Sequence, residues 1–183
     1  MRVGIGYDIH RLVNKRPLVL GGVKIPYHKG LMGHSDADVL VHAIIDALLG
    51  AIGDGDIGHH FPSSNPVYRG ISSLALLKRV GSRVEEDGFA IANIDTTVIA
   101  EQPNLNPFKT AMAQTIARTL EVPENAVNIK AHTNEGLGAV GRGEAMAAHA
   151  VVLLERARGS GFRVLGERAT HTPNPQPRTP NRR

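Results

Sequence analysis

The feature that most constrains the fold is a helical segment with a broad apolar face, between residues 35 and 50. Ser35 is placed to cap its start, and Asp38 follows three residues later. Apolar side chains then recur with the spacing of a helix, at Val39, Leu40, Ile44, Ile45, Leu48 and Leu49. A helix with so wide an apolar face must bury it against another layer of structure, which predicts a globular domain.

The rest of the chain up to about residue 157 alternates between strand and helix signals. Residues 18–20 and 23–25 flank Gly21-Gly22, which is typical of a two-residue hairpin. Strands are expected at 3–7, 94–99 and 127–131, and helices at 72–87 and 107–120. The periodicity of the Ala-rich segment 145–154 fits either a strand or a helix. Because the alternation lacks a strict βαβ rhythm, we predict an α/β (α+β) fold, a two-layer sandwich with a mixed β-sheet packed on helices.

Charge is distributed unevenly along the chain. The whole sequence carries a net charge of +4 and has a pI of about 9.7, but from Arg156 onward it holds seven Arg and one Glu. The remainder is therefore mildly acidic, which argues against nucleic acid as a partner of the folded part. Residues 158–183 are rich in Arg and Pro, and we expect them to form a disordered tail after a single domain at residues 1–157.

Composition also limits the available chemistry. Cys is absent from the sequence, which excludes disulfides, zinc–thiolate clusters and cysteine nucleophiles. Any metal ion would have to bind through His and carboxylate side chains. No apolar run reaches the roughly 20 residues that cross a bilayer, and the first residues lack the apolar region of a signal peptide. We therefore expect a cytoplasmic protein without a membrane partner.

Three side chains are candidates for a metal site. Asp8 and His10 alternate at the end of the predicted first strand, so both point to the same side of it. His42 lies in the apolar helix, where a polar ring needs a partner, and it is the leading candidate for a third zinc ligand. Asp38 and Asp46 lie one turn on either side of it, and we expect Asp46 to accept the free ring N–H of His42.

The same residues also have a simpler interpretation. An Asp-x-His pair is common by chance, and a His in a helix is more often an ordinary core or surface residue than a ligand. His34, His59 and His60 lie near the same helix as rival ligands. Spacing alone therefore leaves metal binding open.

Two glycine-rich segments expose backbone N–H groups at residues 53–58 and 136–143. Such segments can cradle phosphate oxygens, or they can form simple turns. Thr133, Glu135 and Arg142 lie beside the second segment and could together bind an anion and a second hard cation. Metal-dependent phosphate chemistry is the interpretation that uses all of these features.

Several short motifs stand in a fixed order along the chain. They are Gly6-Tyr7-Asp8-Ile9-His10, His34-Ser35-Asp36-Ala37-Asp38, Gly55-Asp56-Ile57-Gly58, Phe61-Pro62 and Gly141-Arg142-Gly143-Glu144. In this order and spacing the chain resembles the 2-C-methyl-D-erythritol 2,4-cyclodiphosphate synthase family over about residues 2–155. The resemblance implies that residues 145–154 form a strand, that the subunit belongs to a homotrimer, and that active sites lie between neighbouring subunits.

The resemblance also implies an activity. A phosphorus–oxygen lyase of this kind cyclises 4-diphosphocytidyl-2-C-methyl-D-erythritol 2-phosphate, releases CMP and serves the non-mevalonate isoprenoid pathway. By the family's pattern, Asp8, His10 and His42 hold Zn²⁺ or another divalent metal. Glu135 by the same pattern helps to hold Mg²⁺ or Mn²⁺ on the diphosphate.

The resemblance implies the remaining site residues, because their positions in this chain match functional positions of the family. The catalytic positions correspond to His34 and Thr133. Contacts to the small-molecule diphosphocytidyl substrate are implied for Ser35, Asp56, Ile57, Gly58, Phe61, Ser63, Asn65, Ala100, Leu105, His132, Asn134, Ala139 and Arg142. We expect the outer pocket to differ from the family's, because the usual residues are replaced at Ser63, Asn65, Asn104, His132 and Ala139.

Two other functions are consistent with the same residues. A metal-dependent phosphohydrolase would use the three ligands to activate water. A non-catalytic metal- or nucleotide-binding paralogue would tolerate the replacements in the outer pocket. Formation of CMP and a cyclic product distinguishes the synthase from both.

Overall fold

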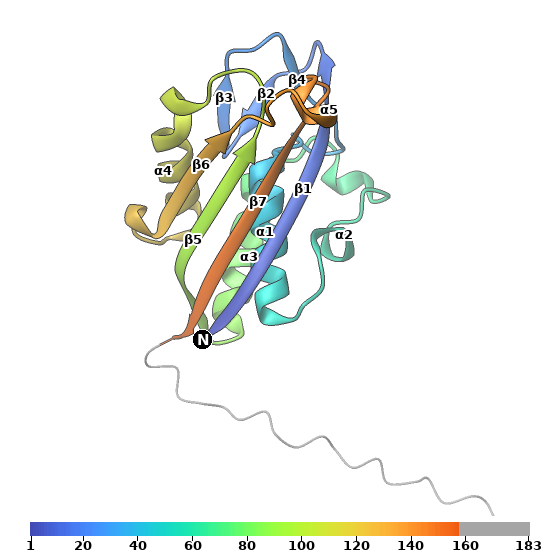
Figure 1. Cartoon of the computed structure of the whole chain (residues 1–183). Helices are drawn as coiled ribbons and strands as arrows, with labels where there is room; N and C mark the ends of the chain where they lie inside the picture. The colour runs from blue at the N-terminus through green and yellow to red at the C-terminus, as the bar shows by residue number, and fades with distance from the viewer. Residues whose placement is uncertain (158–183) are drawn as a thin grey trace, which may run out of the picture.

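The computed structural model describes residues 1–157, and the predicted tail at 158–183 lies outside the described residues. Helices cover one face of a five-stranded sheet (Figure 1). The strand order is β4-β1-β7-β5-β6, with β1 (Arg2–Asn14), β4 (Lys29–Leu31), β5 (Phe89–Ile99), β6 (Val127–His132) and β7 (Ala145–Arg156). Within it β5 and β6 run parallel and the other neighbours antiparallel, so the predicted mixed sheet packed on helices is confirmed.

Three longer helices form the second layer, namely α1 (Val39–Ile52), α3 (Ser73–Glu86) and α4 (Lys109–Leu120). A separate hairpin joins β2 (Leu18–Leu20) to β3 (Val23–Ile25). Short helical turns complete the chain at α2 (Ile57–His60), η1 (Pro66–Tyr68), η2 (Asn106–Phe108), η3 (Glu124–Ala126) and α5 (Gly138–Gly141). The hairpin and the helices expected at 72–87 and 107–120 are therefore confirmed.

The helix α1 forms the centre of the molecule, where it packs against β1 and β7. Nearly all of its side chains are buried, including His42. Burial of each large apolar side chain contributes roughly 1.5–3 kcal/mol. A Cβ atom on Gly4 of β1 would lie 1.9 Å from the carbonyl oxygen of Ala47, so only glycine allows the strand to lie this close to the helix.

The start of α1 differs from the expectation. Asp38, and not Ser35, is the N-cap, and its carboxylate accepts a hydrogen bond from the Val41 backbone N–H at 3.1 Å. The same carboxylate accepts hydrogen bonds from the backbone N–H groups of Gly21 and Gly22, at 3.0 and 2.7 Å. The cap therefore also ties the β2–β3 hairpin to the helix, which a local sequence pattern does not reveal.

The first strand is longer than the predicted residues 3–7. It pairs with β7 from Arg2, opposite Leu154, to Arg11, opposite Ala145. Asp8 and His10 consequently lie inside the strand and not at its end. The same pairing makes residues 145–156 a strand, as the family resemblance implied.

The face of the sheet opposite the helices is partly apolar and exposed. Val3, Ile5, Tyr7 and Ile9 alternate along β1 and are 45–72% exposed, and Val151 of neighbouring β7 is 44% exposed. In residues 1–157 there is no helix of the length and apolar character needed to span a membrane.

Candidate metal centre

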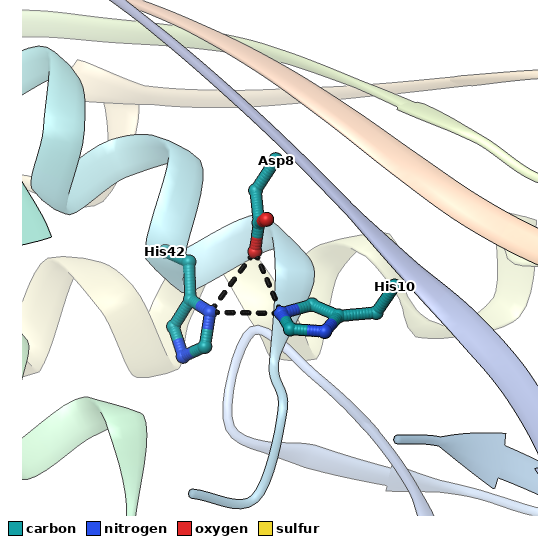
Figure 2. Close-up of side chains that lie close together, drawn as sticks. All are labelled: Asp8, His10 and His42. Atoms are coloured by element: carbon teal, nitrogen blue, oxygen red, sulfur yellow. Dashed lines mark hydrogen bonds and ion pairs between the residues drawn. The ribbon is translucent and has the colours of Figure 1, made fainter. Parts of the chain in front are cut away.

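Asp8, His10 and His42 converge on one point (Figure 2). The Oδ2 atom of Asp8 lies 2.9 Å from Nε2 of His10 and 2.9 Å from Nδ1 of His42. The two ring nitrogens are 3.1 Å apart. The convergence predicted from the sequence is confirmed, because β1 sends Asp8 and His10 to its helix-facing side and α1 crosses that side at His42.

The hydrogen bonds of His10 fix which of its ring nitrogens can bind a cation. Its Nδ1 atom lies 2.8 Å from the carbonyl oxygen of Met32. A carbonyl oxygen only accepts hydrogen bonds, so Nδ1 carries the proton and donates. In the neutral ring the lone pair is therefore on Nε2, which faces Asp8 and His42.

The second nitrogen of His42 has partners that the sequence did not suggest. Its Nε2 atom lies 2.9 Å from the hydroxyl of Ser73 and 3.2 Å from that of Ser35. The prediction that Asp46 holds this ring is wrong, because the Asp46 carboxylate accepts a hydrogen bond from the Ile57 backbone N–H at 2.8 Å. Asp46 thereby fixes the start of α2.

The charges of the triad reinforce one another. Burial raises the pKa of Asp8, but the close contacts of its carboxylate with the His10 and His42 rings, and the positive charge of those rings when they are protonated, outweigh burial and hold that pKa well below its usual range. Burial lowers the pKa of His10, and the hydrogen bond and charge of Asp8 outweigh it, so the net shift is upward. A carboxylate oxygen and two imidazole nitrogens that converge on one point suit a tetrahedral divalent cation, with a fourth position left for another ligand.

The triad lies in the wall of a cavity of about 260 Å³. Predicted site residues that also line it are His34, Ser35, Ile57, Gly58, Phe61 and Ser63. Three further lining residues were not predicted, Tyr68, Ile71 and Leu76, and no local motif marks them. Among the residues described, Nε2 of His34 is a buried side-chain nitrogen without a hydrogen-bond partner, which suits it to meet a ligand in this cavity.

The loop that carries His34 and Ser35 is held from outside by Arg16. Its guanidinium donates hydrogen bonds to the carbonyl oxygens of Gly33 and Ser35, at 3.2 and 3.1 Å. These two bonds fix the backbone on both sides of His34. No local sequence pattern marks Arg16 for this role, since it lies 17 residues before Gly33.

Other predicted site residues gather around a second cavity, also of about 260 Å³, at the ends of β5 and β6. Ala100, Leu105, His132 and Thr133 line it, as does Asn104. This cavity shares no lining residue with the metal cavity. The strand β7 separates β1 from β5, so within one subunit the two cavities are at least two strand spacings apart, roughly 10 Å.

Glu135, Ala139 and Arg142 are exposed and Asn134 is half-buried, all between β6 and β7. Glu135 accepts a hydrogen bond from the Thr133 hydroxyl at 2.7 Å. Within residues 1–157 the potential metal-binding group contains the triad but not Glu135.

Asp56 and Asn65 line neither the metal cavity nor the second cavity. Both side chains act as helix caps, Asp56 for α2 and Asn65 for η1. The substrate contacts implied for these two residues remain predictions.

Comparison with known proteins supports a single family. The model of the YgbB family matches residues 1–155. The chain is 56% identical to a 2-C-methyl-D-erythritol 2,4-cyclodiphosphate synthase from Desulfatibacillum aliphaticivorans, over 85% of this chain and 100% of that protein. It is 58% identical to the enzyme of the same name from Desulforamulus reducens, over 85% of this chain and 99% of that protein.

Solved structures give the same result. The bifunctional IspDF from Campylobacter jejuni matches with a TM-score of 0.82 and 44% identity, over 85% of this chain and 42% of that chain. IspF from Plasmodium falciparum in complex with CDP matches with a TM-score of 0.75 and 33% identity, over 85% of this chain and 96% of that chain. The residues matched by the family model, 1–155, include the metal triad and the residues that line both cavities.

Proposed function

The chain belongs to the YgbB family, and from this membership we propose how its metal triad and two cavities carry out the family's reaction. The protein is a 2-C-methyl-D-erythritol 2,4-cyclodiphosphate-forming enzyme of isoprenoid biosynthesis, a phosphorus–oxygen lyase. The single observation that carries the assignment of the site is the convergence of one potential ligand atom each from Asp8, His10 and His42 on one cavity wall.

The reaction is an internal phosphoryl transfer. An oxygen of the 2-phosphate forms a bond to the β-phosphorus of the diphosphate, and the bond from that phosphorus to the oxygen bridging to CMP breaks. The bonding electron pair leaves with CMP, and water is not consumed. Two anionic groups must therefore be brought together, so positioning and charge neutralisation supply most of the catalysis.

Asp8, His10 and His42 would hold Zn²⁺ or another divalent ion, which polarises a phosphate oxygen and offsets its charge. The ring orientations support this role, since Nε2 of His10 and Nδ1 of His42 both face the Asp8 carboxylate. His34 would contact a phosphate through its buried Nε2 atom, and Arg16 keeps its loop in place. Ser35, Ile57, Gly58, Phe61 and Ser63 would enclose the erythritol part of the substrate.

The second cavity would take the cytidine end, between residues 100–106 and 131–133. The similarity to a structure in complex with CDP supports this assignment. Thr133 and Glu135 lie beside that cavity and are hydrogen-bonded to each other. We assign Thr133 to the transferred phosphate and Glu135 to a Mg²⁺ or Mn²⁺ ion on the diphosphate, with Asp56, Asn65, Asn134, Ala139 and Arg142 as further contacts.

A homotrimer would unite the two cavities. Within one subunit they lie on different strands of the sheet, whereas a single substrate needs both. The exposed apolar face formed by Val3, Ile5, Tyr7, Ile9 and Val151 supplies a surface for a second and third copy to cover. The metal cavity of one subunit would then face the cytidine cavity of its neighbour. The cytoplasmic location and the tail at residues 158–183 remain predictions from the sequence.

The test is direct incubation of the purified protein with the diphosphocytidyl substrate, Zn²⁺ and Mg²⁺, followed by phosphorus NMR. We expect CMP and the cyclic diphosphate in equal amounts. Asp8→Asn should abolish turnover, and Asp87→Asn, which changes an exposed carboxylate at the end of α3, should not. Release of inorganic phosphate would instead identify a phosphohydrolase, and absence of any product would indicate a non-catalytic paralogue.

A further inference from the structure

Ser73 is a buried polar residue behind the metal centre. It is the first residue of α3 and is 0% exposed. Its hydroxyl oxygen lies 2.9 Å from Nε2 of His42, a residue 31 positions earlier in the chain. Asp36, in the loop before α1, contacts Ser73 from the other side. None of the features used for the proposed function accounts for Ser73 or Asp36.

The partners of Ser73 determine the direction of each hydrogen bond. The Ser73 hydroxyl donates its single proton to Oδ1 of Asp36, at 2.5 Å. Its oxygen is then left as an acceptor toward His42, so the proton on that ring lies on Nε2. The lone pair of the neutral His42 ring is therefore on Nδ1, the atom that faces Asp8 at 2.9 Å.

Asp36 is itself held in place by α3. Its Oδ2 atom accepts a hydrogen bond from the backbone N–H of Ser73 at 3.0 Å, in addition to the bond from the hydroxyl. The N-cap residue Ser72 makes no side-chain capping bond, so Asp36 supplies an acceptor that the start of this helix lacks. A carboxylate at a helix N-terminus is also favoured by the helix dipole.

We propose that Asp36 and Ser73 are positioning residues of the metal centre, which orient His42 and hold it in the tautomer that binds the cation. This inference rests on the proposed function in one respect, namely that the triad binds a divalent metal. Partners of this kind fix the orientation of a ligand His and raise its basicity, and their loss typically weakens metal binding by about 10–100-fold.

The first test is zinc affinity in the absence of substrate, measured by competition with a chromophoric chelator. Ser73→Ala should weaken Zn²⁺ binding by about 10–100-fold. Ser72→Ala is the matched control, because it removes a neighbouring exposed hydroxyl that makes no capping bond, and it should bind zinc like the wild type. Affinity of Ser73→Ala within about twofold of the wild type would overturn the proposal, since the expected loss is at least tenfold.

The second test reads the His42 tautomer directly, by long-range nitrogen–proton NMR of the metal-free protein. The wild type should carry the ring proton on Nε2, and Ser73→Ala should shift population toward the Nδ1 form. An unchanged tautomer in Ser73→Ala would overturn the proposal, whereas a purely structural role for Ser73 would lower stability without moving this signal. If Ser73→Ala does not fold, Asp36→Asn takes its place, because the amide keeps the shape and replaces one acceptor by a donor.

The two proposals fail in different ways. A wild-type protein that does not bind zinc contradicts the metal in the proposed function, and the NMR measurement still decides the role of Ser73. A wild type that binds zinc, with Ser73→Ala and Asp36→Asn binding it equally well, contradicts the positioning role alone.

Discussion

Gly6 of β1 packs directly against the backbone of Ala43 in α1, so closely that a Cβ atom on Gly6 would lie 1.9 Å from the Ala43 carbonyl oxygen. Ala43 follows His42, and Gly6 precedes Asp8 by two residues on the same face of the strand. The close approach of strand and helix thus sets the distance across which Asp8 and His42 meet.

Gly6→Ala should damage both the fold and the metal centre. The obstructing atom belongs to the backbone and cannot rotate away, so the strand must move from the helix. We expect the free energy of unfolding to fall by about 3 kcal/mol, the upper part of the range for overpacked cores. Zinc affinity should fall with it, because Asp8 moves away from His42. Urea unfolding and chelator competition measure the two effects.

Gly50→Ala is the control for this substitution. Gly50 lies at an exposed position in α1, and the nearest atom to a Cβ added there would be the Ile5 carbonyl oxygen at 3.9 Å. Alanine should stabilise the helix here by about 0.5–1 kcal/mol. If Gly6→Ala were as well tolerated as Gly50→Ala, close contact would not be what positions the triad.

The assembly can be tested on the exposed face of β1. Ile5→Glu places a charge at the centre of the apolar surface, where Ile5 is 72% exposed in the single chain. If neighbouring subunits cover this face, burial of the unpaired charge should convert trimers to monomers. Light scattering after size-exclusion chromatography gives the mass. Val67→Glu, at a 71% exposed residue of η1, should leave the mass unchanged.

If each active site lies between two subunits, two different inactive variants should complement each other in mixed oligomers. Asp8→Asn should inactivate the metal cavity, and Thr133→Ala should inactivate the neighbour's cytidine side, so each pure oligomer has little activity. Mixed oligomers from co-expression contain some sites with both wild-type residues, and these should restore a measurable part of CMP release. Mixed oligomers as inactive as their parents would show that both residues serve a site within one subunit.

The buried carboxylate of Asp38 predicts a pH effect on stability. Burial raises its pKa to about 6, although three backbone N–H groups donate to it. An unfolded Asp has a pKa of about 3.9, so between these values the folded state keeps a proton that the unfolded chain has lost. The free energy of unfolding should therefore decrease as pH rises through this window, by roughly 3 kcal/mol at most.

Urea titrations of the metal-free protein across this window measure that slope. In Asp38→Asn the contribution should disappear, leaving a shallower dependence on pH. The substitution also replaces one of the two accepting oxygens by an NH2 donor, which removes an acceptor for the backbone N–H groups of the hairpin and of α1 and lowers stability at every pH but does not change the slope. An equal slope in the variant and the wild type would contradict the assigned ionisation.

The sequence by itself determined the parts of this protein that follow from local periodicity. Alternation in a strand places Asp8 and His10 on one side, and the helical spacing around His42 predicts a buried helix. These patterns repeat within a few residues, so they can be recognised without knowing which distant segment packs against them. The motif order of the family added His34, which lines the metal cavity, and the strand nature of residues 145–154.

Tertiary structure alone decided which distant groups meet. Pairing with β7 extends β1 past His10, and the hairpin glycines give Asp38 its role as the cap of α1. His42 takes Ser73 as its partner although Asp46 lies one helical turn away, because the packing of α3 brings the Ser73 hydroxyl to the free ring nitrogen. Periodicity determines the side to which a residue points, whereas the packing of the chain determines what it meets there.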